Sequence, residues 1–141
     1  MDTGKVLALD YGKKRVGVAT GDLDLKVAFP RMVVENRGED YLINRISELV
    51  TDLGVKIIVL GLPLNMDRED ETNEMTDEVR YFASRLRESF PDLKIELFDE
   101  RLSSFEAGEL KGSLNMTAEK NILGKDAYAA QIILQRFFDK L

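Results

Sequence analysis

Acidic side chains on three separate stretches of the sequence are the residues best suited to chemistry. Asp10 follows a short apolar run, the neighbours Asp99 and Glu100 follow another, and Asp126 opens the last segment with helical periodicity. The chain contains no histidine and no cysteine, which excludes histidine-dependent triads, imidazole or thiolate zinc sites, disulfides and cysteine nucleophiles. Carboxylates without these partners indicate a site for hard cations such as Mg²⁺ or Mn²⁺, which take oxygen ligands and can activate water for phosphodiester hydrolysis.

The pattern of neighbouring residues predicts which face of a strand or helix two of these acids occupy. Asp10 has the strand parity of Val6 and Ala8, so it should share their buried face and need a partner there. A turn-forming aspartate that opens a hairpin is the alternative. Asp126 is in phase with Ala130 at helical spacing, so it should point toward the sheet. An acid in a first helical turn also suits the helix dipole.

Asp99 and Glu100 leave an ambiguity. Adjacent side chains on a strand point to opposite faces of the sheet, so only one of the two can share a site with Asp10. Strand parity alone does not decide which of them does. A surface loop with a local pair to Arg101 is the alternative for both.

Five strands and four helices are expected to position these acids. Short apolar runs with tight links predict strands, and the alternation with segments of helical period predicts later strand–helix–strand units. The expected strands cover 6–10, 15–20, 27–34, 56–60 and 93–98, and the expected helices cover 39–53, 75–90, 103–112 and 125–141. The sequence therefore predicts one α/β domain over 1–141. Its mixed five-stranded sheet has three antiparallel strands followed by parallel strands, with helices on both faces. Pro30 in the third strand indicates a bulge or an edge position.

The charge of the chain first argues against nucleic acid as a partner. The 141 residues include 20 basic and 26 acidic side chains, for a net charge of -6. The stretch 67–80 holds seven of the acids and two of the basic residues, so the rest of the chain is close to neutral. Bound cations would neutralise the candidate ligands, and the charge therefore does not exclude a nucleic-acid substrate. No apolar run is long enough to span a membrane and no signal peptide is recognisable, so we expect a cytoplasmic protein.

Four strings in the sequence resemble the YqgF/RuvX family. They lie at 7–19 (LALDYGKKRVGVA), 61–67 (GLPLNMD), 98–104 (FDERLSS) and 125–135 (KDAYAAQIILQ), and they cover the chain in order. Members of this family are bacterial proteins described as Holliday junction resolvases or pre-16S rRNA processing nucleases. The resemblance implies an RNase H-like fold and a metal-dependent acidic site. By motif match it implies Asp10, Glu100 and Asp126 as catalytic residues and metal ligands, and so favours Glu100 over Asp99.

The resemblance further implies a nuclease that uses Mg²⁺ or Mn²⁺ to hydrolyse phosphodiester bonds of structured nucleic acid. The expected reaction is processing of the 5′ end of pre-16S rRNA in ribosome biogenesis. Lys13, Arg15 and Arg101 flank the acids in sequence and would hold adjacent phosphates, with ordinary solvated surface as the alternative. Tyr11 would either stack on a base or pack beside the turn.

Three other functions stay open on the sequence. The first is cleavage of branched DNA, as a Holliday junction resolvase does in recombination and repair. It would use the same acids but needs two sites in a dimer, for which the Tyr128 and Phe138 side of the last helix is the candidate surface. The second is a non-catalytic, nucleic-acid-associated regulatory module. The third is ATP hydrolysis, which in related folds needs a second domain. We expect RNA rather than branched DNA as the partner, no membrane, and a monomer or weak homodimer.

Overall fold

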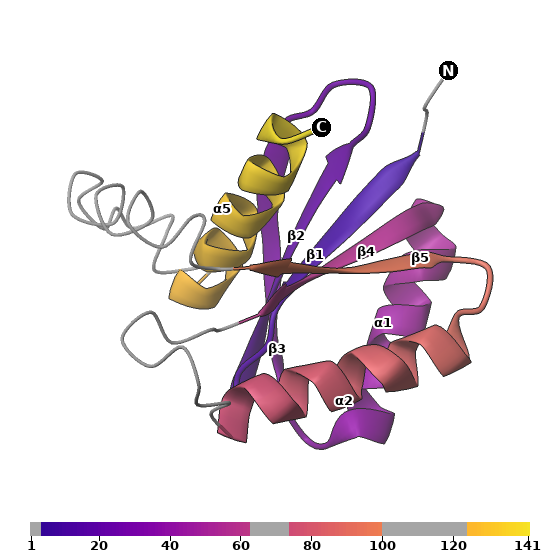
Figure 1. Ribbon diagram of the computed structural model, residues 1–141, viewed down its shortest axis with the longest axis vertical. Helices are drawn as coiled ribbons and strands as arrows, with labels where there is room; N and C mark the ends of the chain where they lie inside the picture. Colours follow the sequence, from indigo (N-terminus) through magenta and orange to yellow (C-terminus); the bar gives the residue numbers. More distant parts are fainter. Residues whose placement is uncertain (1–3, 63–73, 100–123) are drawn as a thin grey trace.

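The computed structural model describes residues 4–62, 74–99 and 124–141, and Figure 1 shows their arrangement. Five strands and three helices lie in these ranges. They are β1 (Lys5–Asp10), β2 (Arg15–Asp22), β3 (Ala28–Glu35), α1 (Glu39–Leu53), β4 (Val55–Leu62), α2 (Glu74–Ser89), β5 (Lys94–Asp99) and α5 (Lys125–Asp139). Each agrees with a predicted element to within two residues. The helix predicted over 103–112 lies outside the described residues.

The strands form one mixed sheet in the order β3-β2-β1-β4-β5. β1 and β3 are both antiparallel to β2, whereas β4 is parallel to β1 and β5 is parallel to β4. The predicted fold class is therefore confirmed. In this topology β1 lies at the centre of the sheet, and the carboxyl ends of β1, β4 and β5 meet at one edge.

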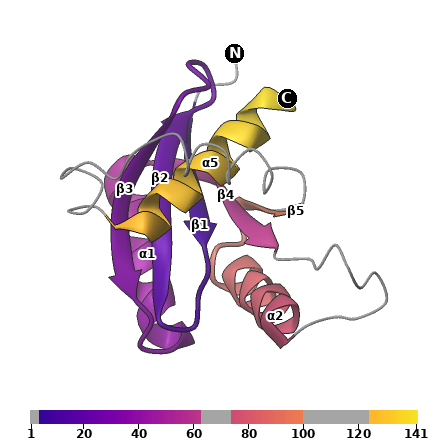
Figure 2. The same ribbon diagram turned by 90° about the vertical axis from the view of Figure 1, so that its left-hand side faces the viewer.

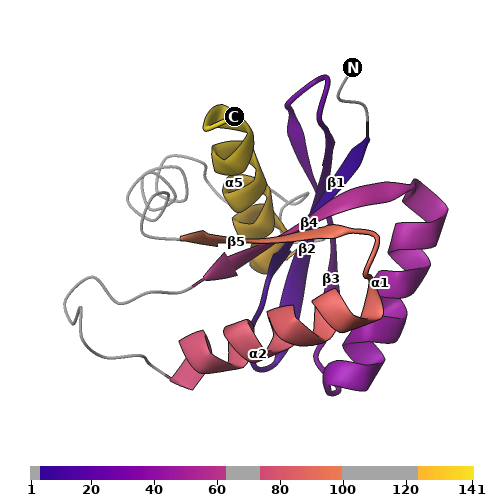
Figure 3. The same cartoon turned by 45° about the vertical axis from the view of Figure 1, so that its right-hand side comes forward.

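Helices cover both faces of the sheet, as the apolar character of both faces of β4 requires. Figure 2 shows α5 in front of the sheet with α1 behind it, and Figure 3 shows α1 and α2 together on that second face. Two apolar clusters fill the interfaces. One joins Val6 and Ala8 of β1 to α5, and the other joins Leu7 and Leu9 to α1 and α2. The alternation along β1 thus decides which residues of this strand meet α5.

The edge strand β3 carries the irregularity that Pro30 predicts. Met32 pairs with Val18 and Pro30 pairs with Ala19, so the register shifts by one residue and Arg31 is left without a partner on β2. Proline has no N–H group to donate to a ladder and is found at edges and bulges for that reason. β3 satisfies both conditions.

Two glutamines of α5 fasten this helix to the start of β3. The side chain of Gln135 accepts a hydrogen bond from the Ala28 backbone N–H at 3.0 Å and donates one to the Lys26 carbonyl at 3.0 Å. Gln131 donates to the Ala28 carbonyl at 3.0 Å. The glutamines therefore bond backbone groups at the start of the sheet's edge strand, and they fix the position of α5 along the sheet.

We expect Gln135→Ala to lower the free energy of unfolding by about 2 kcal/mol, because it removes two hydrogen bonds that hold Lys26 and the first residue of β3 to α5. Gln131→Ala removes one such bond and should cost about 1 kcal/mol. Urea titrations of both variants measure the difference, provided that the slope of the transition is unchanged. Equal losses in the two variants would contradict this account of how α5 is held.

The C-terminal end differs from the sequence prediction in two respects. The helix ends at Asp139, two residues before the end predicted for it, and Leu141 is 61% exposed. Phe138 is only 2% exposed and its ring packs over Gly21. The prediction that Phe138 contributes to an exposed dimer surface is therefore wrong. None of the helices in the described ranges has the length and hydrophobicity needed to cross a bilayer.

Candidate functional site

Asp10 lies at the carboxyl end of the central strand, on the face that α5 covers. Val6 and Ala8 are fully buried beneath α5, and the alternation of side chains along β1 turns Asp10 to the same side. Unlike these two residues, Asp10 is partly exposed, because it is the last residue of β1 and lies where the carboxyl ends of the parallel strands meet. Its partner across the antiparallel ladder is Gly17 of β2.

Gly17 lets the first turn of α5 pack directly against the sheet. A side chain at this position would overlap the backbone carbonyl of Asp126, and it would also meet the backbone nitrogen of Ala127. Residues directly opposite in an antiparallel pair point to the same face and lie about 5 Å apart. Gly17 is thus in contact with Asp126 on one side and paired with Asp10 on the other. This close approach brings the two acids, 116 positions apart in the sequence, to one edge of the sheet.

Asp126 lies in the first turn of α5, where its charge complements the positive end of the helix dipole. Its side chain is 34% exposed, in phase with the buried Ala130 and Ile133, as the helical periodicity indicates. The Arg15 Nε atom donates a hydrogen bond to Oδ2 of Asp126 at 3.0 Å. Arg15 opens β2 and is 62% exposed, so this ion pair lies at the surface.

The ambiguity between Asp99 and Glu100 is narrowed by the residues before them. Phe98 packs in the cluster beneath α5, whereas Ile95 and Leu97 pack toward α1 and α2. Alternation therefore directs Asp99 to the face opposite that of Asp10. Glu100 and Arg101 lie outside the described residues, and their roles stay predictions.

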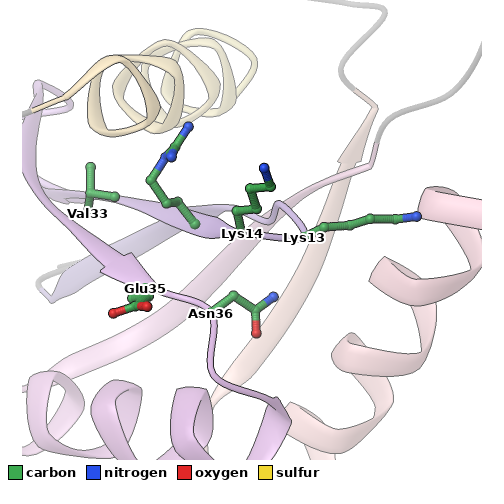
Figure 4. A pocket seen from close by; sticks show the side chains of 6 residues that line it. Lys13, Lys14, Val33, Glu35 and Asn36 are labelled. Carbon is green, nitrogen blue, oxygen red and sulfur yellow. The ribbon is translucent and has the colours of Figure 1, made fainter.

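A groove is lined in part by Arg15, the ion-pair partner of Asp126, and basic side chains form one side of it. Its volume is ≈ 620 Å³, and the residues around it are Lys13, Lys14, Arg15, Val33, Glu35 and Asn36. Figure 4 shows Lys13 extending toward α2, with Glu35 and Asn36 on the side of the groove that β3 supplies. The charge of Glu35 is already balanced, because the Arg37 guanidinium donates to it from Nε at 3.2 Å and from a terminal nitrogen at 3.0 Å. This hydrogen bond raises the pKa of Arg37.

The three basic side chains of the groove differ in the ion pairs that they form. Lys13 lies 3.5 Å from a carboxylate oxygen of Glu74 in the first turn of α2, and Arg15 is paired with Asp126. Lys14 forms no ion pair with another residue in the described part of the chain. All three are exposed, so their ion pairs are weak and can be exchanged for a stronger anion.

Tyr11 packs against the core and not toward the groove. Its ring centroid lies 5.1 Å from that of Phe82 on α2, and it contacts the apolar cluster beneath α1 and α2. Of the two sequence interpretations of Tyr11, the structure favours packing beside the turn over stacking on a base.

Glu35 and Asn36 were not singled out by the sequence. Arg15 of β2 pairs with Glu35 of β3, and this pairing places Glu35 and Asn36 in the groove. The register of the two strands at this point depends on the bulge at Arg31. A strand glycine often marks a close backbone approach, so Gly17 is the signal that could have led to the docking site of α5.

Comparison with known proteins decides the relationship of this chain. The model of the family described as "RuvX: Holliday junction resolvase" matches residues 4–140. The chain belongs to the RuvX family. Two similar relatives, each named "Putative pre-16S rRNA nuclease", come from Maridesulfovibrio salexigens and Thiobacillus denitrificans. The first is 44% identical over 93% of this chain and 95% of the relative, and the second is 40% identical over 96% and 92%.

Solved structures confirm the fold of this RuvX family member. Thermus thermophilus RuvC in complex with a Holliday junction substrate superposes with a TM-score of 0.61 at 10% identity, over 97% of this chain and 94% of RuvC. A second structure of Thermus thermophilus RuvC gives a TM-score of 0.59 at 13% identity, over 96% and 95%. At such low identity the likeness concerns the fold, which is RNase H-like, as the sequence resemblance implied.

Proposed function

We propose that this chain is a metal-dependent nuclease, with one catalytic domain, that processes the 5′ end of pre-16S rRNA. The observation that carries the proposal is the contact of Gly17 with the first turn of α5, which brings Asp10 and Asp126 to one edge of the sheet beside a basic groove. Acids from separate elements, next to cations that can hold phosphates, suit phosphodiester hydrolysis. The names of the relatives support pre-16S rRNA as the substrate. Maturation of this RNA is a step of ribosome biogenesis, and we propose that it takes place in the cytoplasm.

The donor set fits a hard divalent cation. Asp10 and Asp126 supply carboxylate oxygens, and the chain has neither histidine nor cysteine to favour zinc or another softer metal. Within the ranges that the structure describes no three acids form a cluster, and the third proposed ligand, Glu100, lies outside those ranges. A bound Mg²⁺ or Mn²⁺ would supply an activated water and neutralise charge at the leaving oxygen.

The residues of the chain bind and orient the substrate around these acids. Lys13, Arg15 and, by motif match, Arg101 hold phosphates next to the scissile one. Arg15 is well suited because its guanidinium is exposed and already lies at Asp126. A phosphate that enters the groove can pair with Arg15, whose planar fork matches a phosphate in two hydrogen bonds. Asp126 then loses its pairing with Arg15 and is available to a cation.

The charge balance predicts how tightly RNA is bound. A net charge of -6 leaves few cations for phosphates, and most of the candidates lie in the groove and its turn. Binding to nucleic acid should therefore be weak and strongly dependent on salt concentration.

Cleavage of branched DNA is the second candidate, because the family model carries the description of a Holliday junction resolvase. The proposed catalytic residues are the same for both reactions. Symmetric cleavage of a four-way junction needs two sites in a dimer. Phe138 is buried against the sheet, so it is not available to a partner, and a monomer or weak homodimer is the state that we propose.

A cleavage assay distinguishes these functions. Precursor 16S rRNA, an unrelated structured RNA and a four-way DNA junction are each incubated with Mg²⁺ and with Mn²⁺. We expect cleavage near the 5′ end of the precursor, and slower or no cleavage of the other two substrates. Preferential cutting of the junction would favour the resolvase. Absence of cleavage together with absence of Mn²⁺ binding at millimolar concentration would favour a non-catalytic module.

A further inference from the structure

The turn between β1 and β2, residues 11–14, carries the lysines of the groove. It starts immediately after Asp10 and ends at Arg15, so its shape controls where these cations lie relative to the acids. The turn is tight, because a Cβ atom at Gly12 would lie 2.6 Å from the carbonyl oxygen of Arg15. The backbone carbonyl groups of such a turn need hydrogen-bond partners, and partners within the protein help to hold its shape.

Asn36, in the link between β3 and α1, supplies these bonds. Its side-chain Nδ2 donates to the Gly12 carbonyl at 2.8 Å, and its backbone N–H donates to the Lys14 carbonyl at 2.9 Å. Its Oδ1 accepts from the N–H of Gly38, at the N-terminus of α1, at 3.0 Å. One half-buried side chain therefore ties the turn to the start of a helix.

The two hydrogen bonds from Asn36 reach the turn just before Lys13 and at Lys14, so they hold the backbone that carries both lysines. Gly12 precedes Lys13, and the second accepting carbonyl belongs to Lys14 itself. In Figure 4, Asn36 lies next to the segment that carries Lys13 and Lys14. Because the carboxamide of Asn36 is engaged on both its nitrogen and its oxygen within the protein, Asn36 acts on a ligand through the turn.

We propose that the groove is a preformed subsite for the phosphodiester backbone beside the scissile bond, and that Asn36 is the positioning residue that keeps it preformed. The proposal rests on the function proposed above. It adds where the nucleic-acid strand is held, which is over the β1–β2 turn and toward β3 and the start of α1. A turn that is ordered before binding spares the complex the entropy of ordering it. Lys14 joins Lys13 as a phosphate-binding residue of this subsite.

The test is the affinity for a fluorescein-labelled RNA stem–loop, measured by fluorescence anisotropy in EDTA so that the RNA is not cut. We expect Asn36→Ala to raise the Kd roughly three- to tenfold, as the loss of one preordered contact would. The Lys13→Ala, Lys14→Ala double variant should raise it further and reduce the salt dependence of binding. Asn44→Ala, on the exposed face of α1, is the matched control and should leave the Kd unchanged.

A double-mutant cycle separates positioning from a general structural role. If Asn36 acts through the lysines, Asn36→Ala should change the Kd less than about twofold in the variant that lacks both lysines. The same three- to tenfold loss in both backgrounds would overturn the proposal. Should Asn36→Ala not fold, Asn36→Ser serves instead, because serine can still bond the Gly38 N–H but cannot reach Gly12.

The outcomes also distinguish this inference from the proposed function. If the lysine variant binds RNA as well as the unmodified chain, the subsite and the RNA-binding role of the groove are both overturned. If the lysines matter and Asn36 does not, only the positioning role fails. Cleavage by the unmodified chain in the assay described above tests the proposed function separately, because it uses neither the lysine variant nor the Asn36 variant.

Discussion

Replacing Gly17 by alanine is expected to reduce cleavage at least about 100-fold, because a displacement of about 1 Å at a reacting site can have that effect. The added methyl group has no room between β2 and the backbone of Asp126, so the first turn of α5 must move away from the sheet. Asp126 then separates from Asp10, and the affinity for Mn²⁺ should fall with the activity. Initial cleavage rates and a Mn²⁺ titration by calorimetry measure the two effects.

Gly21→Ala is the matched control for this experiment. Gly21 lies on the same strand and faces the same helix, and its added Cβ would approach the Phe138 ring within 2.7 Å and the Val27 carbonyl within 2.6 Å. Both variants should lose about 1–3 kcal/mol of stability through overpacking. Only Gly17→Ala should lose metal affinity and activity. Equal loss of activity in the two variants at a temperature where both are folded would contradict the role given to Gly17.

Asp10→Asn and Asp126→Asn are each expected to lower cleavage at least about 100-fold, because each removes a charged oxygen that we propose as a ligand of the catalytic cation. Neither should greatly destabilise the fold. The Arg15–Asp126 pair is exposed and contributes at most about 1 kcal/mol. Melting temperatures measured with and without Mn²⁺ provide a second readout, since a bound ion stabilises the native state by mass action. The increase caused by Mn²⁺ should disappear in both variants.

The control for these two substitutions is Asp22→Asn. Asp22 also ends a strand and forms an ion pair, with Lys5 at 2.9 Å, but it lies at the opposite end of the β1–β2 ladder from Asp10. Its substitution should leave both the cleavage rate and the Mn²⁺-induced stabilisation intact. Activity that survives in both Asp10→Asn and Asp126→Asn would refute the proposed catalytic site.

The secondary structure could be predicted because each element carries its own local signal. The helical period over 39–53 and Gly54 after it predict α1, and Gly54 indeed ends the helix in the left-handed conformation with φ 69°. The continuous apolar run of β4 predicts a strand covered on both faces. These signals depend only on neighbours in the sequence, so tertiary structure did not change them.

The site was predicted less completely, because it depends on packing between distant segments. β5 has apolar residues of both parities, Ile95 and Leu97 on one side and Phe98 on the other, so the sequence cannot tell which face α5 covers. The face of the sheet to which Asp99 points becomes clear only from the position of Phe98 beneath α5. Likewise, Glu35 and Asn36 reach the groove through the register of β2 and β3. Pro30 indicates a bulge or an edge position in this strand, but it does not show which residues of β2 and β3 pair.

The docking of α5 also has a consequence for the nascent chain. α5 follows every strand of the sheet in the sequence, and it supplies Asp126 together with the two glutamines bonded to the start of β3. During synthesis the sheet can form while the apolar face beneath α5 is still open to solvent and Asp10 lacks Asp126 beside it. A ribosome-bound chain stalled before Lys125 should therefore be inactive toward RNA and prone to bind chaperones. Catalytic competence would appear in one step, when the last helix packs against Gly17.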